Sequence, residues 1–338
     1  MKSRMMPGLL IAVLAAMTSS PAYAQAVDSQ CPPGSLNSAG KPDNTMVSQD
    51  ACQKAIDLFQ YMAPQLGLVL AGGSPNQGVS GTLGGLGHFS FGIRGNLLSA
   101  SLPQVDRVVP NTRGARVDIY PIDTKTLGFA TADASIGLTK GMATSGLGAI
   151  DLLVSLSYVP EYKSSSVDVT VPSPFDVGFG AKVGLLRETA IRPGISISYL
   201  SRGLPFVNIT GKSGEDRLTL DSVRVSARSW RLEAGKKLSI LGLGAGVGRD
   251  TYDSHAKVSV IVAPREATEG GTGGPIDLVQ KISRTNIFGT AWFGGQNVSI
   301  VGEIGRAFGG SITTYNQFDG ALPASPRTYT SIGLSFKH

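Results

Sequence analysis

Few residues in this sequence have types and spacing that could perform chemistry. His255 follows Asp250 and Asp253 in the run RDTYDSH. An aspartate beside a histidine can serve as a general acid–base pair for peptide hydrolysis. Polar side chains are also ordinary at the exposed end of a strand, and we favour that interpretation because no catalytic motif surrounds the run.

Two other arrangements superficially suggest catalysis or nucleotide binding. Ser254 adjoins His255, but neighbours in a strand point to opposite faces, and the sequence contains no GxSxG elbow. Residues 242–248 (GLGAGVG) place glycine at every second position, whereas a nucleotide fingerprint needs a strand, a tight turn and a helix. We therefore expect no catalytic residue, no cofactor and no metal site, and we interpret the chain as non-enzymatic.

The N-terminus carries an export signal. Lys2 and Arg4 precede a short apolar core at 8–17, and Ala22-Tyr23-Ala24 forms a small-x-small cleavage site. This pattern predicts a cleaved secretory signal peptide over residues 1–24. The net charge of the chain is only +6, to which Lys2 and Arg4 contribute, so no nucleic-acid partner is expected.

Residues 25–65 are predicted to form an N-terminal segment with one short helix. Cys31 and Cys52 are the two cysteines, and export into an oxidising compartment predicts a disulfide between them. Apolar residues at helical spacing predict a helix from Ser48 to about Met62, ended by Pro64. The helix could be a small periplasmic helix clipped by the disulfide or a plug lying inside or under the barrel, and we expect the first.

The rest of the chain, residues 66–338, has the composition and period of membrane-spanning strands. Charged residues make up only 16% of the chain, glycine occurs 44 times, and no mature stretch has 18 consecutive apolar residues. Apolar residues alternate with glycine, serine and scattered charges, which is the period of strands. The clearest segments are 89–97, 130–138, 152–158, 175–185, 195–199, 241–247, 298–304 and 330–336.

Segment and loop lengths favour a membrane barrel over a soluble β-sandwich. Many segments reach ten residues, the length that crosses a bilayer at a tilt. Short links (140–146, 187–190, 235–237, 294–296) alternate with long ones (99–114, 160–174, 201–217, 264–280, 307–326), as in barrels with short periplasmic turns and long outer loops. The predicted fold is all-β: a transmembrane antiparallel up-and-down β-barrel of 10–12 strands, 14 being the upper count, in which 115–139 bends at Pro121 and 65–71 could add a strand.

The last strand, residues 327–337, resembles the C-terminal assembly signal of bacterial outer-membrane barrels. Ile332, Leu334 and Phe336 supply its alternating apolar residues and near-terminal aromatic, although Lys337 and His338 extend past Phe336. The resemblance implies an outer-membrane β-barrel of a Gram-negative envelope, with outer-membrane lipid and the barrel assembly machinery as partners.

The polar faces of the strands supply candidates for the lumen, and the strand ends supply candidates for interfacial aromatic belts. We expect the lumen charges to pair with one another and fill a narrow barrel; a small, weakly anion-attracting channel is the alternative. The lumen candidates are Arg94, Lys182, Arg224, Arg228, Asp133, Asp176 and Glu303, and the belt candidates are Tyr158, Tyr199, Trp230, Trp292 and Phe293.

Two families share the general architecture. The order of export signal, N-terminal segment and strands resembles that of hydrophobic-compound transporters, which have fourteen strands, but no plug motif of that family is recognisable. Ten strands with aspartate and histidine outside the membrane resemble the omptin-type surface proteases. We expect a structural or surface-exposed, porin-like barrel, or a narrow channel or transporter for a small or apolar solute. An omptin-like protease and a soluble secreted β-protein are the alternatives.

Overall fold

The computed structural model describes residues 26–36, 38, 40, 43–74, 81–165, 167–265, 270–295, 297–320 and 322–338. The predicted signal peptide, 1–24, lies outside these residues. Within them, no helix is both long enough and apolar enough to span a membrane.

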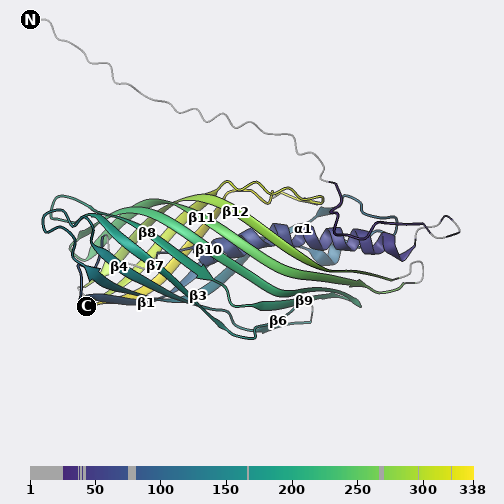
Figure 1. Cartoon of the computed structure of the whole chain (residues 1–338), viewed down its shortest axis with the longest axis horizontal. Helices are drawn as coiled ribbons and strands as arrows, with labels where there is room; N and C mark the ends of the chain where they lie inside the picture. The colour runs from purple at the N-terminus through teal and green to yellow at the C-terminus, as the bar shows by residue number, and fades with distance from the viewer. Residues whose placement is uncertain are drawn as a thin grey trace, which may run out of the picture.

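Ten antiparallel strands close into an up-and-down barrel, which confirms the predicted fold (Figure 1). Each strand pairs with the next, and the last pairs with the first through the register Phe91 to Phe336. The barrel strands are β1 (Phe89–Pro103), β3 (Ile122–Thr139), β4 (Ile150–Tyr158), β7 (Phe175–Leu186), β8 (Gly194–Gly203), β10 (Asp216–Leu238), β11 (Leu241–Val262), β12 (Gly271–Gly294), β13 (Val298–Phe308) and β15 (Arg327–Lys337).

The two ends of the barrel differ as the alternating links predict. Short turns join the strands at the end where β1 begins and β15 stops, and we call this the turn end. The long connections lie at the opposite end, the loop end, where β10, β11 and β12 extend to 22–24 residues. Short strands extend the sheet there: β5 (Tyr162–Lys163), β6 (Val167–Thr170) and β9 (Val207–Ser213).

The outer wall is apolar over the turn-end half of the barrel. On β11 the outward side chains are Leu241, Leu243, Ala245 and Val247, and Arg249 is the first charged one. Eight residues of tilted strand rise by about 20 Å, close to the ~25 Å apolar band of outer-membrane barrels. Ile332, Leu334 and Phe336 of the last strand also face outward, with 56%, 50% and 41% of their surface exposed.

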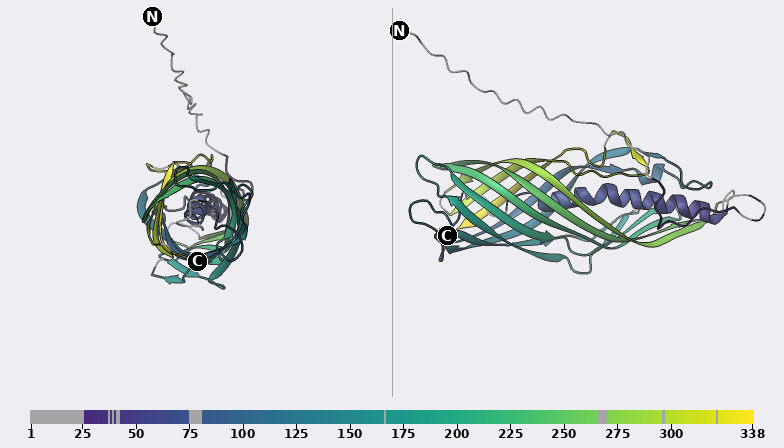
Figure 2. Two further views of the ribbon diagram at one scale, coloured as in Figure 1. Left: turned by 90° about the vertical axis from the view of Figure 1, so that its left-hand side faces the viewer. Right: turned by 45° about the horizontal axis from the view of Figure 1, so that its top comes forward.

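Helix α1 (Asn44–Ala71) lies inside the barrel, which corrects our expectation of a small periplasmic helix outside it (Figure 2). It has 28 residues rather than the fifteen predicted, because Pro64 sits within the helix instead of ending it. Residues 65–71 are its last turns and not a strand. Ile56, Phe59 and Leu68 pack against inward side chains of the wall, so the helix replaces water in the loop-end half of the lumen.

Two short strands at the loop end hold long connections over the helix. The chain breaks at Pro121, so that β2 (Ile119–Tyr120) leaves the line of β3 and pairs in parallel with β14 (Gln317–Phe318). The expected single strand over 115–139 is therefore two strands. Beneath the pair, the Phe318 ring stacks on the helix residue Tyr61 with centroids 3.9 Å apart.

The predicted disulfide is present between Cys31 and Cys52, with Cα atoms 5.7 Å apart. It joins the segment before the helix to the third turn of α1, so the N-terminal segment stays at the loop end. The structure therefore threads this part of the chain through the lumen: the helix enters from the loop end, and the first barrel strand starts at the turn end.

Gly67 permits the helix to lie against the wall at β11. A Cβ atom at Gly67 would stand 2.5 Å from Cγ of Tyr252, a fully buried side chain. We predict that Gly67→Ala lowers unfolding stability by about 1–3 kcal/mol, because the ring must move within a packed lumen. Denaturant unfolding in micelles, followed by tryptophan fluorescence, measures this effect.

Gly95→Ala is the matched control, because its Cβ atom would meet nothing within 4 Å. Equal unfolding midpoints for the two variants would contradict the close approach of the helix and Tyr252.

Candidate functional site

The most distinctive site in the lumen is the contact between the C-terminal end of α1 and the barrel wall. The last carbonyl oxygens of a helix have no partners within the helix and carry the negative end of its dipole. In α1 the final turn holds no basic residue of its own, and it ends in the middle of the barrel, away from bulk water. These carbonyl groups therefore need donors from the wall.

Three arginines from different strands supply those donors. Arg94 of β1 donates from Nη1 to the Gly72 carbonyl at 2.5 Å. Arg202 of β8 and Arg231 of β10 donate from Nη2 to the Ala71 carbonyl at 2.9 and 2.8 Å. We call Arg94, Arg202 and Arg231 the arginine cluster; all three are at least 96% buried.

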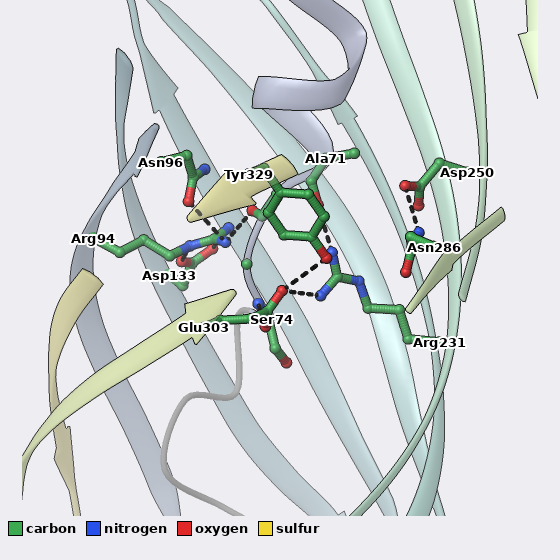
Figure 3. A network of polar contacts seen from close by, with 12 residues as sticks. Ala71, Ser74, Arg94, Asn96, Asp133, Arg231, Asp250, Asn286, Glu303 and Tyr329 are labelled. Carbon is green, nitrogen blue, oxygen red and sulfur yellow. Dashed lines mark hydrogen bonds and ion pairs between the residues drawn. The ribbon is translucent and has the colours of Figure 1, made fainter. Parts of the chain in front are cut away.

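Carboxylates on neighbouring strands pair with two of the arginines (Figure 3). Asp133 of β3 accepts from Nε of Arg94 at 2.5 Å, and Glu303 of β13 accepts from Nη1 of Arg231 at 2.8 Å. Glu303 also accepts from the Tyr329 hydroxyl and from the backbone N–H of Ser74, both at 3.1 Å. The arginine cluster, its two carboxylate partners and Tyr329 of β15 thus connect the helix end and the chain that follows it to six strands of the wall.

The cluster is also a strong energetic constraint. Removing one partner of a buried ion pair costs roughly 3–5 kcal/mol, because the remaining charge is left unpaired away from water. Arg202 forms no ion pair with a carboxylate of the described residues. It donates instead to the carbonyl oxygens of Ala71 at the helix end and of Gly72 and Gly73 just after it. The helix end is therefore its counter-charge.

The loop-end half of the helix is fixed by backbone groups of the long connections. Asp50 accepts from the N–H groups of Asn111 and Arg116 at 2.6 and 2.9 Å, and it also pairs with Lys54. Asp57 accepts from the N–H of Asn316 at 2.8 Å and from its side-chain amide at 2.6 Å. Two acidic residues of the helix thus hold two loops over the mouth of the barrel.

Two carboxyl groups at the loop end have shifted pKa values. Burial raises the pKa of Asp57, although hydrogen bonds from Asn316 oppose the shift. Hydrogen bonds from Ser35 and Thr45 lower the pKa of Asp43, the N-cap of α1. The lowered pKa of Asp43 stabilises the folded state fully above the ordinary aspartate pKa, and this contribution is lost as the pH falls through the lowered value. The raised pKa of Asp57 acts in the opposite direction: it stabilises the folded state below the ordinary aspartate pKa, and this contribution is lost as the pH rises through the raised value.

The turn-end half of the lumen is polar and narrowed by aromatic rings. Lys182 pairs with Glu233, to which Ser196 also donates at 3.3 Å. Phe288 and Trp292 point inward across the glycine face of β11, where a Cβ atom at Gly242 or Gly246 would collide with their rings. The alternating glycines of 242–248 therefore make room for aromatic side chains within the lumen.

The structure brings together some of the predicted lumen residues and separates others. Arg94, Asp133, Lys182 and Glu303 are buried in the lumen and form the pairs described above, and Asp176 lies half-buried on the inward face beside Gly203. Arg224 and Arg228 instead lie on the outer face of β10.

Arg224 and Arg228 face outward because the apolar face of β10 changes sides along the barrel. Near the turn end, Leu232 faces lipid, whereas at the loop end Val225 and Ala227 face inward against the apolar helix. Arg202 and Arg231, which the sequence reasoning missed, could have been found from alternation: Arg202 continues the face of Ser196 and Ser198, and Arg231 stands between two lipid-facing residues.

The belt aromatics and the RDTYDSH run also receive definite positions. Tyr158, Trp230 and Phe293 are exposed on the outer wall, Tyr199 is half-buried beside Trp230, and Trp292 lies in the lumen instead.

Within the RDTYDSH run, Asp250 points into the lumen, whereas Asp253 and His255 face outward, where Arg228 pairs with Asp253. The run thus divides between two faces of the sheet. Among the described residues, no group of His, Cys, Asp and Glu could hold a metal ion.

Comparisons with known proteins find a likeness in solved barrels only. No family model and no curated protein matches the sequence. The N-terminal β-barrel domain of OprF from Pseudomonas aeruginosa is 10% identical (75% of this chain, 99% of that chain, TM-score 0.26), and Ail of Yersinia pestis with a heparin analogue is 8% identical (75% and 99%, TM-score 0.26). The translocator domain of the autotransporter NalP from Neisseria meningitidis is 8% identical (74% and 87%, TM-score 0.39). These similarities are too slight to transfer a function.

We predict that Arg202→Met frees the C-terminal end of the helix. The Ala71 carbonyl loses one of its two donors, and a hydrogen bond to a charged group contributes about 1.5–3 kcal/mol. Backbone amide exchange over residues 66–74, measured by mass spectrometry in micelles, should become about ten- to a hundredfold faster.

Arg228→Met removes an arginine of the outer wall and serves as the control, with exchange over 66–74 unchanged. Slow exchange in both variants would show that the arginine cluster does not hold the helix.

Proposed function

We propose that this chain is a non-enzymatic outer-membrane barrel of a Gram-negative envelope, closed to solutes by its own N-terminal helix and exposed at the cell surface. The observation that carries the proposal is the arginine cluster, which fixes the end of a lumen helix to the wall. Ten strands enclose a narrow lumen, and α1 occupies its loop-end half.

The contacts at both ends of the helix favour a plug that stays in the lumen over a gate that moves. The arginine cluster binds its C-terminal end, and at the other end Asp50 and Asp57 bind the long loops. The disulfide joins the plug to the preceding segment. Releasing the helix would break the hydrogen bonds of both ends with the wall and the loops in one step, while the disulfide within the N-terminal segment stays intact. The number of these hydrogen bonds favours a closed barrel over a channel for a small or apolar solute.

The sidedness of the barrel follows from its connections. Outer-membrane barrels turn tightly in the periplasm and carry long loops outside. The loop end, where α1 begins, would then face the exterior, so residues 26–36 would be displayed at the cell surface although they precede the barrel in sequence. The helix would then run from the cell surface into the lumen of its own barrel, with its C-terminal end in the middle of the barrel.

A conductance measurement tests whether the barrel is closed. We predict that the full chain gives no steady openings in planar bilayers, whereas a variant lacking residues 26–74 conducts ions, because the deletion removes the plug and leaves the ten strands. Steady openings of the full chain would contradict the proposal, and their size would support a narrow channel instead.

Antibody labelling of intact cells tests the sidedness. We predict that an epitope inserted after Leu36, which is 58% exposed at the loop end, is labelled without permeabilisation. An epitope inserted after Leu147, in the turn between β3 and β4, should be labelled only after permeabilisation. Labelling in the reverse order would place the helix entrance in the periplasm.

A further inference from the structure

The outer wall has a strongly cationic part just above the apolar band. Above the apolar band, the outward face carries an arginine on three strands: Arg228 on β10, where Lys236 lies below the band at the turn end, Arg249 on β11 and Arg306 on β13. Each stands eight to ten residues from the turn end of its strand, so the three lie at a similar height. Lys281 of β12 and Arg224 of β10 lie further toward the loop end.

Carboxylates account for only part of this charge. Arg228 pairs with Asp253, and Lys257 approaches Asp277 at 3.8 Å. Four exposed cations form no ion pair with another described residue. We call these four residues the cationic sector: Arg224, Arg249, Lys281 and Arg306.

The charge is confined to one side of the barrel. At the same height on the other strands, the outward residues are uncharged: Ser99 on β1, Ala130 on β3, Tyr158 on β4, Val177 on β7, Ser201 on β8, Thr285 on β12 and Thr328 on β15. A charge serving only solubility would be spread around the mouth. The asymmetry points to a ligand that meets the wall over β10–β13.

An apolar groove runs down the wall directly below Arg306. Ile287 and Gly289 of β12 and Ile304 of β13 line it, with Thr328 at its side. The guanidinium carbon of Arg306 lies 5.8 Å from the Phe308 ring centroid, a contact that leaves its N–H donors available at the top of the groove. A cation above an apolar groove matches a molecule with an anionic head and a hydrocarbon chain.

We propose that the cationic sector binds the phosphate groups of a phosphorylated glycolipid in the outer leaflet, with one acyl chain in the groove below Arg306. Guanidinium groups bind phosphate oxygens through parallel charged hydrogen bonds. Neighbouring strands are about 4.8 Å apart, and Arg306 lies two residues along β13 from the position in register with Arg249, so the two Cα atoms are separated by about 12 Å. The two long side chains are then within reach of the two phosphates of a single headgroup or of adjacent ones.

This inference rests on the proposed membrane location but not on a closed lumen. A conducting barrel would overturn the proposed function and leave the lipid contact untouched, whereas loss of lipid binding from a non-conducting barrel would overturn the inference alone.

The test uses the full chain in nanodiscs of phosphatidylcholine containing either bis-phosphorylated lipid A or the same lipid after enzymatic dephosphorylation. We expect the wild-type chain, extracted in mild detergent, to retain about tenfold more of the phosphorylated lipid, measured by mass spectrometry. The combined substitutions Arg249→Gln, Lys281→Gln and Arg306→Gln should abolish that preference. Equal retention of the two lipids by the wild type would overturn the inference.

The matched control removes the same number of charges outside the cationic sector: Lys125→Gln, Lys163→Gln and Lys212→Gln, all exposed at the loop end. It should retain the wild-type preference, and an equal loss in both triple variants would reduce the effect to net charge. Heat-dependent gel mobility confirms that both variants are folded. Displacement of the lipid by 10 mM inorganic phosphate would show a site for the free ion and contradict a lipid site.

Discussion

The end of a helix inside a barrel needs hydrogen-bond donors, and most of this structure depends on how that need is met. A 28-residue helix in open water would have its last carbonyls solvated. In the lumen, Arg94, Arg202 and Arg231 take the place of water, and Asp133 and Glu303 balance two of them. Because these groups come from five strands, the helix can occupy its position only when the barrel is closed.

The same constraint explains the division of the lumen into two halves. Where the helix is present, the inward faces of β10–β12 are apolar, and their outward faces carry charge because they lie beyond the membrane band. Where the helix is absent, the inward faces carry serine, Lys182 and Glu233, and the outward faces are apolar. A strand such as β10 thus exchanges its apolar and polar faces along its length. Its apolar face turns inward where the helix lies inside the barrel and outward where the helix is absent.

The sequence predicts those parts of the fold that depend on local period. Alternation and loop length are properties of neighbouring residues, so the ten strands, their order and the two ends of the barrel could be predicted. The cysteine pair was predictable from the compartment. The position of the helix could not be predicted, because Ile56 and Phe59 would form the same apolar stripe against any partner. Its length could not be predicted either, because proline usually ends a helix, whereas Pro64 lies within this one. The outward position of Arg224 and Arg228 could not be predicted, because the helix inside the barrel reverses the apolar face of β10. Alternation places Arg202 and Arg231 on inward faces, but the helix end that they bind cannot be read from the same pattern.

The most direct test of a helix held in the lumen is a covalent link between the helix and the wall. A Cβ atom at Gly67 would lie 2.9 Å from Cβ of Tyr252, near enough for a disulfide after a small shift. In the double variant Gly67→Cys, Tyr252→Cys, the account predicts a linked peptide pair joining 67 to 252, found by mass spectrometry without reduction. Replacing Thr251 instead of Tyr252 should give no such link, because Thr251 faces the other side of β11. Free thiols at both 67 and 252 in the folded barrel would contradict the account.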